Sequence, residues 1–287
     1  TGPLLPFRVR PWAVHLTIES TRGRLWFKAS CPALAFEPLL HHELSLIVPH
    51  AVSPPLAIDA ARGWMLNVEH GAMLQRGAAG GLADWLAVVR EVIEVQQRLM
   101  PHRDRLLASH MPDCSPATVV NRFDRLLVLL QDLPEDHPSR LSPNDVELLT
   151  QARASVEQAV GVLDSGLLGC SWQHGDLHLG NVYSDGEQIQ LFDFGDSQWA
   201  HVLETLVIPF SILNAEHPDW WRPIRAASAE AWDLSEAQFD SLWSAARVTQ
   251  AVNRASTWHS LSEGLSLDTF ADWAHNAKQH LLRLAHV

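Results

Sequence analysis

Two short polar segments, 174–181 and 191–196, constrain this chain more than any other part of its 287 residues. The first reads His-Gly-Asp-Leu-His-Leu-Gly-Asn and the second reads Leu-Phe-Asp-Phe-Gly-Asp. Between them, β-prone residues lie on both sides of a Ser-Asp-Gly sequence at 184–186, which has the composition of a tight turn. We therefore predict a short hairpin that brings the two polar segments close together.

Two side chains of these segments suit a divalent cation bound to a polyphosphate, and a third suits a general base. Mg²⁺ prefers hard oxygen ligands and keeps phosphate oxygens and water among them. The carboxylate of Asp193 and the amide oxygen of Asn181 are ligands of this kind. Asp176 is then free to accept a proton from an attacking hydroxyl group. One base and two metal ligands are the parts that kinase-type phosphoryl transfer requires.

The pattern His-x-Asp-x-x-x-x-Asn at 174–181, followed by Leu-Phe-Asp-Phe-Gly-Asp, resembles the aminoglycoside phosphotransferase and choline-kinase-like family of small-molecule kinases. The resemblance implies an α+β fold of two lobes, like that of protein kinases. A small β-rich N-terminal lobe with one helix would bind the nucleotide at residues 1–68. A larger, mostly α-helical C-terminal lobe at 69–287 would hold the catalytic loop and the acceptor. The implied cofactors are ATP or GTP and Mg²⁺.

The N-terminal region supplies a candidate for the phosphate-binding lysine. Apolar residues alternate at 14–18 and again at 25–28, with a glycine turn between them, which predicts an antiparallel hairpin. Lys28 ends the second strand, and Lys278 is the only other lysine in the sequence. In the kinase plan a strand lysine binds the α- and β-phosphates and pairs with a glutamate on the next helix.

Two acids could pair with this lysine from the helix that we expect at 32–47. The resemblance favours Glu37, because a Val-Pro pair follows it at 48–49, at the distance that related small-molecule kinases use. Glu43 remains the alternative. The two residues point to different faces of a helix, so only one of them can face the site.

The adenine-binding edge and the loop over the phosphates are less marked. An apolar strand is predicted at 64–68, and backbone groups around Leu66 and Val68 would read the base there. No glycine cluster lies between the first two strands, where protein kinases cover the phosphates. Arg10 and Trp12, which lie near that position, are the candidates for this task.

The remainder of the chain is predicted to be helical, on the basis of apolar residues that recur every three or four positions. The expected helices cover 82–99, 117–130, 143–163, 235–252 and 267–284. The acceptor pocket of the family lies among such helices. Five acids in this half could meet a cationic acceptor, and no spacing singles one out: Glu204, Glu216, Asp219, Glu230 and Glu263.

Composition excludes several other functions. A net charge of −12 disfavours binding to nucleic acid or to an anionic membrane, although it is compatible with a cationic acceptor. No apolar run has the length of a membrane span. Three scattered cysteines favour a reducing cytoplasm over a disulfide framework.

Three functions therefore remain open. The first is phosphorylation of an aminoglycoside-like small molecule, with a role in antibiotic resistance. The second is a metabolic kinase for a sugar or for a choline-like or homoserine-like amino alcohol. The third, of another class, is a non-catalytic pseudokinase that binds nucleotide. The intact set of Lys28, Asp176, Asn181 and Asp193 argues against the third.

Overall fold

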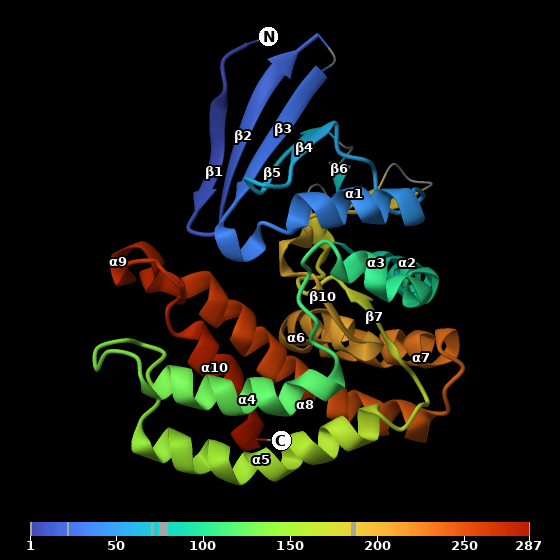
Figure 1. The fold of residues 1–287 in the computed structure, drawn as a ribbon. Coiled ribbons are helices and arrows are strands. Elements are labelled where there is room, and N and C mark those ends of the chain that lie inside the picture. The colour runs from blue at the N-terminus through green and yellow to red at the C-terminus, as the bar shows by residue number, and fades with distance from the viewer. Residues whose placement is uncertain (1, 22, 70–71, 75–79, 185–187, 287) are drawn as a thin grey trace.

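The computed structural model describes residues 2–21, 23–69, 72–74, 80–184 and 188–286. Figure 1 shows a small antiparallel sheet with one helix above a larger part that is mostly helical. This arrangement confirms the predicted α+β fold of two lobes. None of the described helices is long and apolar enough to cross a membrane.

The N-terminal sheet has the strand order β1-β2-β3-β5-β4, and every neighbouring pair is antiparallel. Its strands are β1 Leu5–Arg10, β2 Ala13–Ser20, β3 Gly23–Ser30, β4 Ala57–Asp59 and β5 Trp64–Val68. The pairing sets His15 and Met65 on either side of Lys28 in the middle of the sheet. The predicted hairpin is therefore β2–β3, and it presents Lys28 as expected.

The helix expected at 32–47 begins later than predicted. Residues Pro32–Leu34 form a 3₁₀ turn, and α1 runs from Glu37 to Ile47. The reason is Pro38, which has no backbone N–H and is tolerated only in the first turn of a helix. A helix that started at residue 32 would have placed this proline in its interior.

The C-terminal lobe is mostly helical. Its helices are α2 Leu82–Leu99, α3 Arg103–Leu107, α4 Pro116–Gln131, α5 Pro143–Leu163, α6 Val207–Glu216, α7 Trp221–Ala231, α8 Glu236–Ser262, α9 Leu267–Phe270 and α10 Asn276–Leu282. The longest helix, α8, packs against α4, α5, α7 and α10. The helix predicted at 235–252 continues to Ser262, whereas the one predicted at 267–284 is divided between α9, α10 and 3₁₀ turns.

Two small sheets connect the lobes and carry the polar segments. Strand β7 Cys170–Gln173 pairs with β10 Gln198–His201, and β8 Val182–Ser184 pairs with β9 Ile189–Leu191. The β8–β9 pair confirms the predicted hairpin, although the turn at 185–187 lies outside the described residues. Strand β6 Ala72–Met73 joins β8, so the chain pairs with the C-terminal lobe soon after β5 ends. The boundary at residues 68 and 69 stays a prediction.

A buried glutamine on α2 fixes the strand that leads into the first polar segment. The side-chain amide of Gln96 donates hydrogen bonds to the carbonyl oxygens of Trp172 and Val202, at 3.1 Å each. The hydroxyl of Ser171 donates to the carbonyl oxygen of Gln96 at 2.7 Å. Because all of these groups are buried, each bond satisfies a polar atom that water does not reach. The position of β7 is therefore set by its hydrogen bonds to α2.

Candidate active site

Lys28 lies between two carboxylates in the interface of the lobes. Its Nζ is 2.6 Å from Glu37 Oε1 and 2.6 Å from Asp193 Oδ1. The hydroxyl of Ser30 donates to the other oxygen of Glu37 at 2.9 Å. Glu37 therefore pairs with the lysine. Glu43, the alternative from the sequence, faces α3 and pairs with Arg105.

The charges of this cluster support one another. Burial lowers the pKa of Lys28, but the carboxylates of Asp193 and Glu37 outweigh it and hold that pKa above its ordinary value. Burial raises the pKa of Asp193, and the charge of Lys28 brings it well below its ordinary value. Glu37 is fully buried, and its pKa is raised by burial despite the lysine. Lys28 and Asp193 are thus both charged near neutral pH.

The loop that follows β7 is fixed by His174 and Gly175. His174 is fully buried, and its Nε2 donates to the carbonyl oxygen of Phe192 at 3.0 Å. The backbone N–H of Asp176 donates to His174 Nδ1 at 3.4 Å. One neutral tautomer satisfies both bonds, and burial lowers the pKa of His174. This histidine therefore braces the two polar segments against each other.

Gly175 is required by a close approach of the two segments. Its φ is +81°, and a Cβ at this position would lie 1.9 Å from the carbonyl oxygen of Asp196. Only glycine adopts this conformation and leaves room for the opposite backbone. The Gly in His-Gly-Asp thus has a structural explanation that the sequence could not supply.

Asp176 and Asn181 are held on the same loop. The Asn181 Nδ2 donates to the backbone carbonyl oxygen of Asp176 at 3.0 Å. The Asp176 carboxylate is one-third exposed, with His178 Nε2 at 3.6 Å and Arg254 Nη2 at 3.7 Å from its oxygens. Burial raises the pKa of Asp176, but the contact with His178 and then the charge of Arg254 lower it overall. A partly exposed, ionised carboxylate is available here as a base.

The donor set fits a magnesium ion. Asn181 and Asp193 line the same cavity. The hydrogen bond of Asn181 to the loop uses Nδ2, so Oδ1 stays available as an acceptor in the described structure. Asp193 has the left-handed φ of +66° and engages Lys28 with Oδ1, and its Oδ2 lies 3.9 Å from Arg8 Nη2. No group of three or more His, Cys, Asp or Glu residues forms a metal cluster in the described ranges. Two hard oxygen donors are nevertheless what Mg²⁺ takes from a protein when phosphates supply the rest.

A cavity of about 270 Å³ separates the lobes above Asp193. Its lining residues are Phe7, Arg8, His15, Trp26, Phe27, Lys28, Glu37, His41, Met65, Asn67, Val68, Glu69, Met73, Gly180, Asn181, Tyr183, Phe192 and Asp193. Val68 is among them, as the sequence suggested. Leu66 is not, and its carbonyl oxygen accepts a bond from Leu56 N–H within the sheet at 2.8 Å.

A second cation beside Asp193 was missed in the sequence analysis. Arg8, from β1, lies 3.9 Å from Asp193 Oδ2, and it lines the cavity. Arg10 and Trp12, the candidates from the sequence for covering the phosphates, lie elsewhere. Trp12 packs edge-on against Trp258 and Trp273, and the Arg10 guanidinium lies over the Trp273 ring at 5.7 Å. These two residues join the β1–β2 turn to the C-terminal helices instead.

Arg254 is the second residue that sequence reasoning missed. It lies on α8, is 8% exposed, and pairs through Nη1 with Asp196 at 2.6 Å. Its Nη2 approaches Asp176, as described above. Asp196 is thus engaged by an arginine. No signal in the sequence marks Arg254, because it lies 58 residues from its partner on an otherwise ordinary helix.

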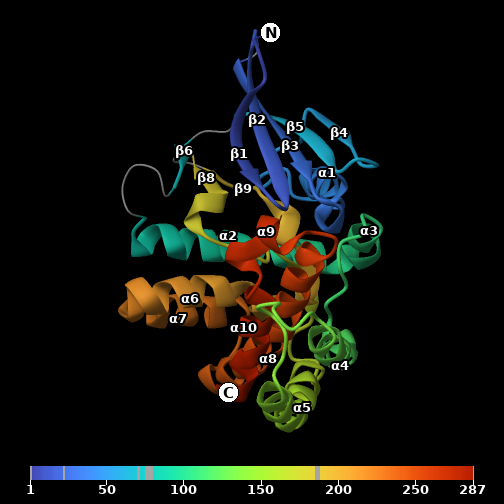
Figure 2. The ribbon, with the colours of Figure 1, turned by 90° about the vertical axis from the view of Figure 1, so that its left-hand side faces the viewer.

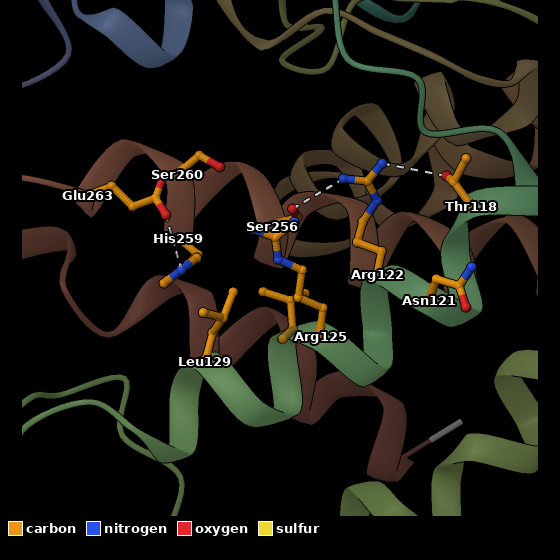
Figure 3. A pocket seen from close by; sticks show the side chains of 10 residues that line it. Thr118, Asn121, Arg122, Arg125, Leu129, Ser256, His259, Ser260 and Glu263 are labelled. Atoms are coloured by element: carbon orange, nitrogen blue, oxygen red, sulfur yellow. Dashed lines mark hydrogen bonds and ion pairs between the residues drawn. The ribbon is translucent and has the colours of Figure 1, made fainter.

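A second pocket, of about 350 Å³, lies between α4 and α8 (Figure 3). Figure 3 shows Arg122 directed at Ser256 and Thr118, while His259 Nε2 lies 3.7 Å from Glu263 Oε1.

Glu263, which lines this pocket, was one of the acids considered for a cationic acceptor. Glu204, another of these acids, is buried. Thr249 and Asn253 of α8 donate hydrogen bonds to its carboxyl group.

Solved structures share this fold, although no protein-family model and no curated protein sequence matches the chain. An ethanolamine kinase from Plasmodium vivax has a TM-score of 0.67 at 9% identity, covering 99% of this chain and 82% of that one. A choline kinase from Streptococcus pneumoniae has a TM-score of 0.60 at 12% identity, covering 98% and 94%. The chain has the fold of small-molecule kinases.

A third structure widens the range of similar enzymes. The GDP complex of aminoglycoside 2′-phosphotransferase-IIIa has a TM-score of 0.56 at 13% identity, covering 99% of this chain and 92% of that one. The likeness inferred from 174–196 is thus confirmed for the fold. At such identities it does not extend to the acceptor.

Proposed function

We propose that this chain transfers the γ-phosphate of ATP or GTP to a hydroxyl group of a small molecule. The observation that carries the proposal is the convergence of Lys28, Asn181 and Asp193 on one cavity. Asp176 lies on the same loop as Asn181 and is bonded to it. Phosphoryl transfer requires this set of charges, because its catalysis consists mainly of positioning and electrostatic stabilisation.

Each residue has a distinct task in this proposal. The ammonium group of Lys28 binds the α- and β-phosphates, and Glu37 keeps it oriented and charged. Arg8, at the mouth of the cavity, neutralises phosphate oxygens where a glycine-rich loop is lacking. Asn181 and Asp193 would hold Mg²⁺, which when bound neutralises charge on the phosphates. The carboxylate of Asp176 accepts the proton of the attacking hydroxyl group.

The nucleotide base would lie at the end of β5. Val68 lines the cavity there together with Met65 and Asn67, and the ring of Trp26 lines the same space. We assign Leu66 a supporting task, because its carbonyl oxygen is already bonded within the sheet. Apolar lining with a few polar groups is typical of small-molecule sites.

The cellular location that we propose is the cytoplasm. Cys31, Cys114 and Cys170 are all free thiols, as expected in a reducing compartment. ATP, GTP and Mg²⁺ are available there. Antibiotic resistance is one consequence that this activity could have, but no contact described above favours it over a metabolic role.

Turnover assays test the proposal. We expect MgATP or MgGTP to be consumed with at least one member of a panel of hydroxyl compounds, and Asp176→Asn to lower the rate by about 10²- to 10⁴-fold. The matched control is Asp136→Asn, an exposed aspartate in the α4–α5 loop, which should leave the rate unchanged. Nucleotide binding without any Asp176-dependent turnover, including hydrolysis by water, would indicate a pseudokinase. No binding of either nucleotide with Mg²⁺ present would refute the proposal.

A further inference from the structure

Positive charge gathers on the acceptor side of the site. Arg254 touches the proposed base from α8, and Arg247 lies seven residues earlier on the same helix. The 3₁₀ turn Arg283–His286 and helix α10, which both pack against α8, add Arg283 and the imidazole of His280, which is neutral near pH 7 because burial lowers its pKa to about 3. We call these four residues the basic cluster. Figure 2 shows α8 and α10 beside α6, below the β8–β9 hairpin.

The members of the basic cluster are close enough to influence one another. Burial and then the charges of Arg254 and Arg247 lower the pKa of Arg283. Burial, followed by the charges of Arg283 and Arg254, lowers the pKa of His280 to about 3. Like charges held together raise the free energy of the protein unless an opposite charge is brought to them.

The described part of the chain does not provide enough opposite charge. Arg254 is the only member with carboxylate partners there, and these are Asp176 and Asp196. Within the same ranges Arg247 and Arg283 form no ion pair, and the guanidinium of Arg247 lies 5.2 Å above the Phe210 ring.

Two buried nitrogens of the cluster also lack a partner. Arg254 Nε and His280 Nδ1 are buried and make no hydrogen bond in the described structure. A buried donor without a partner is costly and is usually satisfied by water or by a ligand. Arg254 Nε and His280 Nδ1 are therefore two polar atoms of the cluster that no group of the described chain satisfies.

The spacing of the arginines suits a small acceptor. Seven residues of α-helix span about 10 Å, so Arg247 lies about two turns from the arginine that touches the base. A molecule whose hydroxyl group faces Asp176 would bring its far end toward Arg247 and Arg283. Two of the acids considered for a cationic acceptor do not line this path: Glu204 is buried against Thr249 and Asn253, and Glu263 faces the α4–α8 pocket.

We propose that the acceptor is an anionic hydroxyl compound, whose carboxylate or phosphate group is bound by Arg247 and Arg283 while its hydroxyl group faces Asp176. This inference rests on the proposed kinase function and names its substrate class. The acceptor oxygen forms a bond to the γ-phosphorus, and the bond from that phosphorus to the β-γ bridging oxygen breaks. ADP or GDP leaves, and the hydroxyl proton passes to Asp176 and then to water.

The test uses acceptors that differ only in charge. Glycerate and glycerol 3-phosphate are compared with glycerol, gluconate is compared with glucose, and choline, ethanolamine and kanamycin represent cations. We expect turnover with at least one anionic compound, and the carboxylate and phosphate arms distinguish the two anions. Higher ionic strength should raise the acceptor KM, because the contact is electrostatic.

Three variants separate binding from catalysis. Arg247→Met and Arg283→Met replace exposed side chains, and each should raise KM for the anionic acceptor by about 10- to 100-fold with kcat nearly unchanged. Arg90→Met is the matched control, because Arg90 is an exposed arginine on α2 without an ion pair in the described ranges, and it should change neither constant.

The possible failures are distinguishable. Efficient turnover of a cationic or neutral compound, insensitive to both arginine variants, would overturn the inference and leave the kinase function standing. So would nucleotide hydrolysis that depends on Asp176 but is not joined by transfer to any anionic compound. Absence of nucleotide binding would reject the kinase function and the inference together.

Discussion

The proposed nucleotide side and the proposed acceptor side of the site each place one buried cation between two carboxylates. On the nucleotide side Lys28 is 2.6 Å from both Glu37 and Asp193, so the two contacts are equally short. The three groups come from β3, α1 and the segment after β9. This cluster joins the two lobes through a single ammonium group.

The acceptor side is unequal. Arg254 binds Asp196 at 2.6 Å but approaches Asp176 only to 3.7 Å. The short contact fixes the guanidinium, and the long one leaves the base with an accessible carboxylate. The difference teaches that a buried cation can serve two purposes. A symmetric cluster holds a cofactor-binding charge in place, whereas an asymmetric one tunes a base without blocking it.

Removal of the lysine should have the largest effect. Lys28→Met leaves Glu37, which is fully buried, without its cation, and breaking a buried pair costs about 3–5 kcal/mol of unfolding free energy. Phosphate binding should be lost as well. The control is Lys278→Met, whose ammonium pairs with Asp145 at 2.7 Å and is one-quarter exposed, so that about 1 kcal/mol or less is expected.

Denaturant unfolding and nucleotide titration measure both consequences for the two lysines. A Lys28→Met/Glu37→Gln double variant should recover part of the stability but none of the nucleotide affinity. Equal losses of stability in the two single variants would contradict the symmetric cluster.

Replacement of Arg254 should act on the base through its pKa. Burial raises the pKa of Asp176, but the contact with His178 and the charge of Arg254 keep this pKa below its ordinary value. The base works only when ionised, so activity is lost as pH falls through this pKa. In Arg254→Met the pKa rises, and the acidic limb of kcat/KM should move to higher pH. At a fixed pH on that limb, the rate falls about tenfold for every pH unit by which the limb moves.

The pH profile of turnover, or of the slow hydrolysis by water, checks this displacement of the limb. Arg90→Met again serves as the control for loss of an arginine. A profile that falls uniformly at all pH values would show that Arg254 only supports the fold.

A smaller loss of stability is expected from a substitution at Gly175, which precedes Asp176 in the loop after β7. Gly175 and Gly264 have nearly the same φ, +81° and +77°, but a Cβ at Gly264 would meet no atom within 4 Å. Gly264→Ala should therefore cost about 1 kcal/mol of unfolding free energy, from backbone strain alone. Gly175→Ala adds the collision with the Asp196 carbonyl and should cost about 3 kcal/mol. Equal costs in urea unfolding would show that the loop relaxes freely.

The two clusters also differ in how far the sequence could predict them. Lys28 was predictable because it ends a strand with clear alternation, and Asp193 because it belongs to a motif with defined spacing. The choice of Glu37 over Glu43 depended on the resemblance, since either acid lies on the same helix. The helix at 143–163 was predicted at its observed bounds, because Ser142 and Pro143 mark its start.

The other features of the site could not be predicted from the sequence, because they arise from tertiary contacts. Strand β1 Leu5–Arg10 alternates apolar and basic residues at 7–10, but this pattern does not reveal that Arg8 reaches the cavity. The basic cluster unites α8 with the C-terminal turn, and helical periodicity cannot say which helices pack together. The burial of Glu204 was equally hidden, because an acid is normally exposed.

Glu204 sharpens the comparison, because it is a buried carboxyl group that forms no ion pair in the described ranges. It accepts hydrogen bonds from Thr249 Oγ1 at 2.6 Å and Asn253 Nδ2 at 2.9 Å. Burial raises its pKa to about 8, despite these bonds. Beside Asp193 the charge of Lys28 outweighs burial and keeps the carboxylate ionised. At Glu204 the charge of Arg122 is too weak to outweigh burial, and the folded protein keeps the proton up to about pH 8.

The pH dependence of stability follows from this raised pKa. An unfolded chain releases the Glu204 proton near its ordinary pKa of about 4.3, whereas the folded chain retains it up to about pH 8. Between these values unfolding becomes more favourable as pH rises, so the contribution of Glu204 to stability is present at low pH and is lost toward pH 8. Glu204→Gln removes the titration, and its amide can donate to Asn253 Oδ1, which has no partner in the described structure.

We therefore expect Glu204→Gln to unfold at a higher urea concentration than the parent chain at pH 8, and at a similar one at pH 5. Glu230→Gln, which changes an exposed acid on α7, should show no such difference between the two pH values. A destabilised Glu204→Gln at pH 8 would mean that Glu204 is ionised in the folded protein. The group would then require a positive charge nearby, and the contrast with Lys28 and Arg254 would not hold.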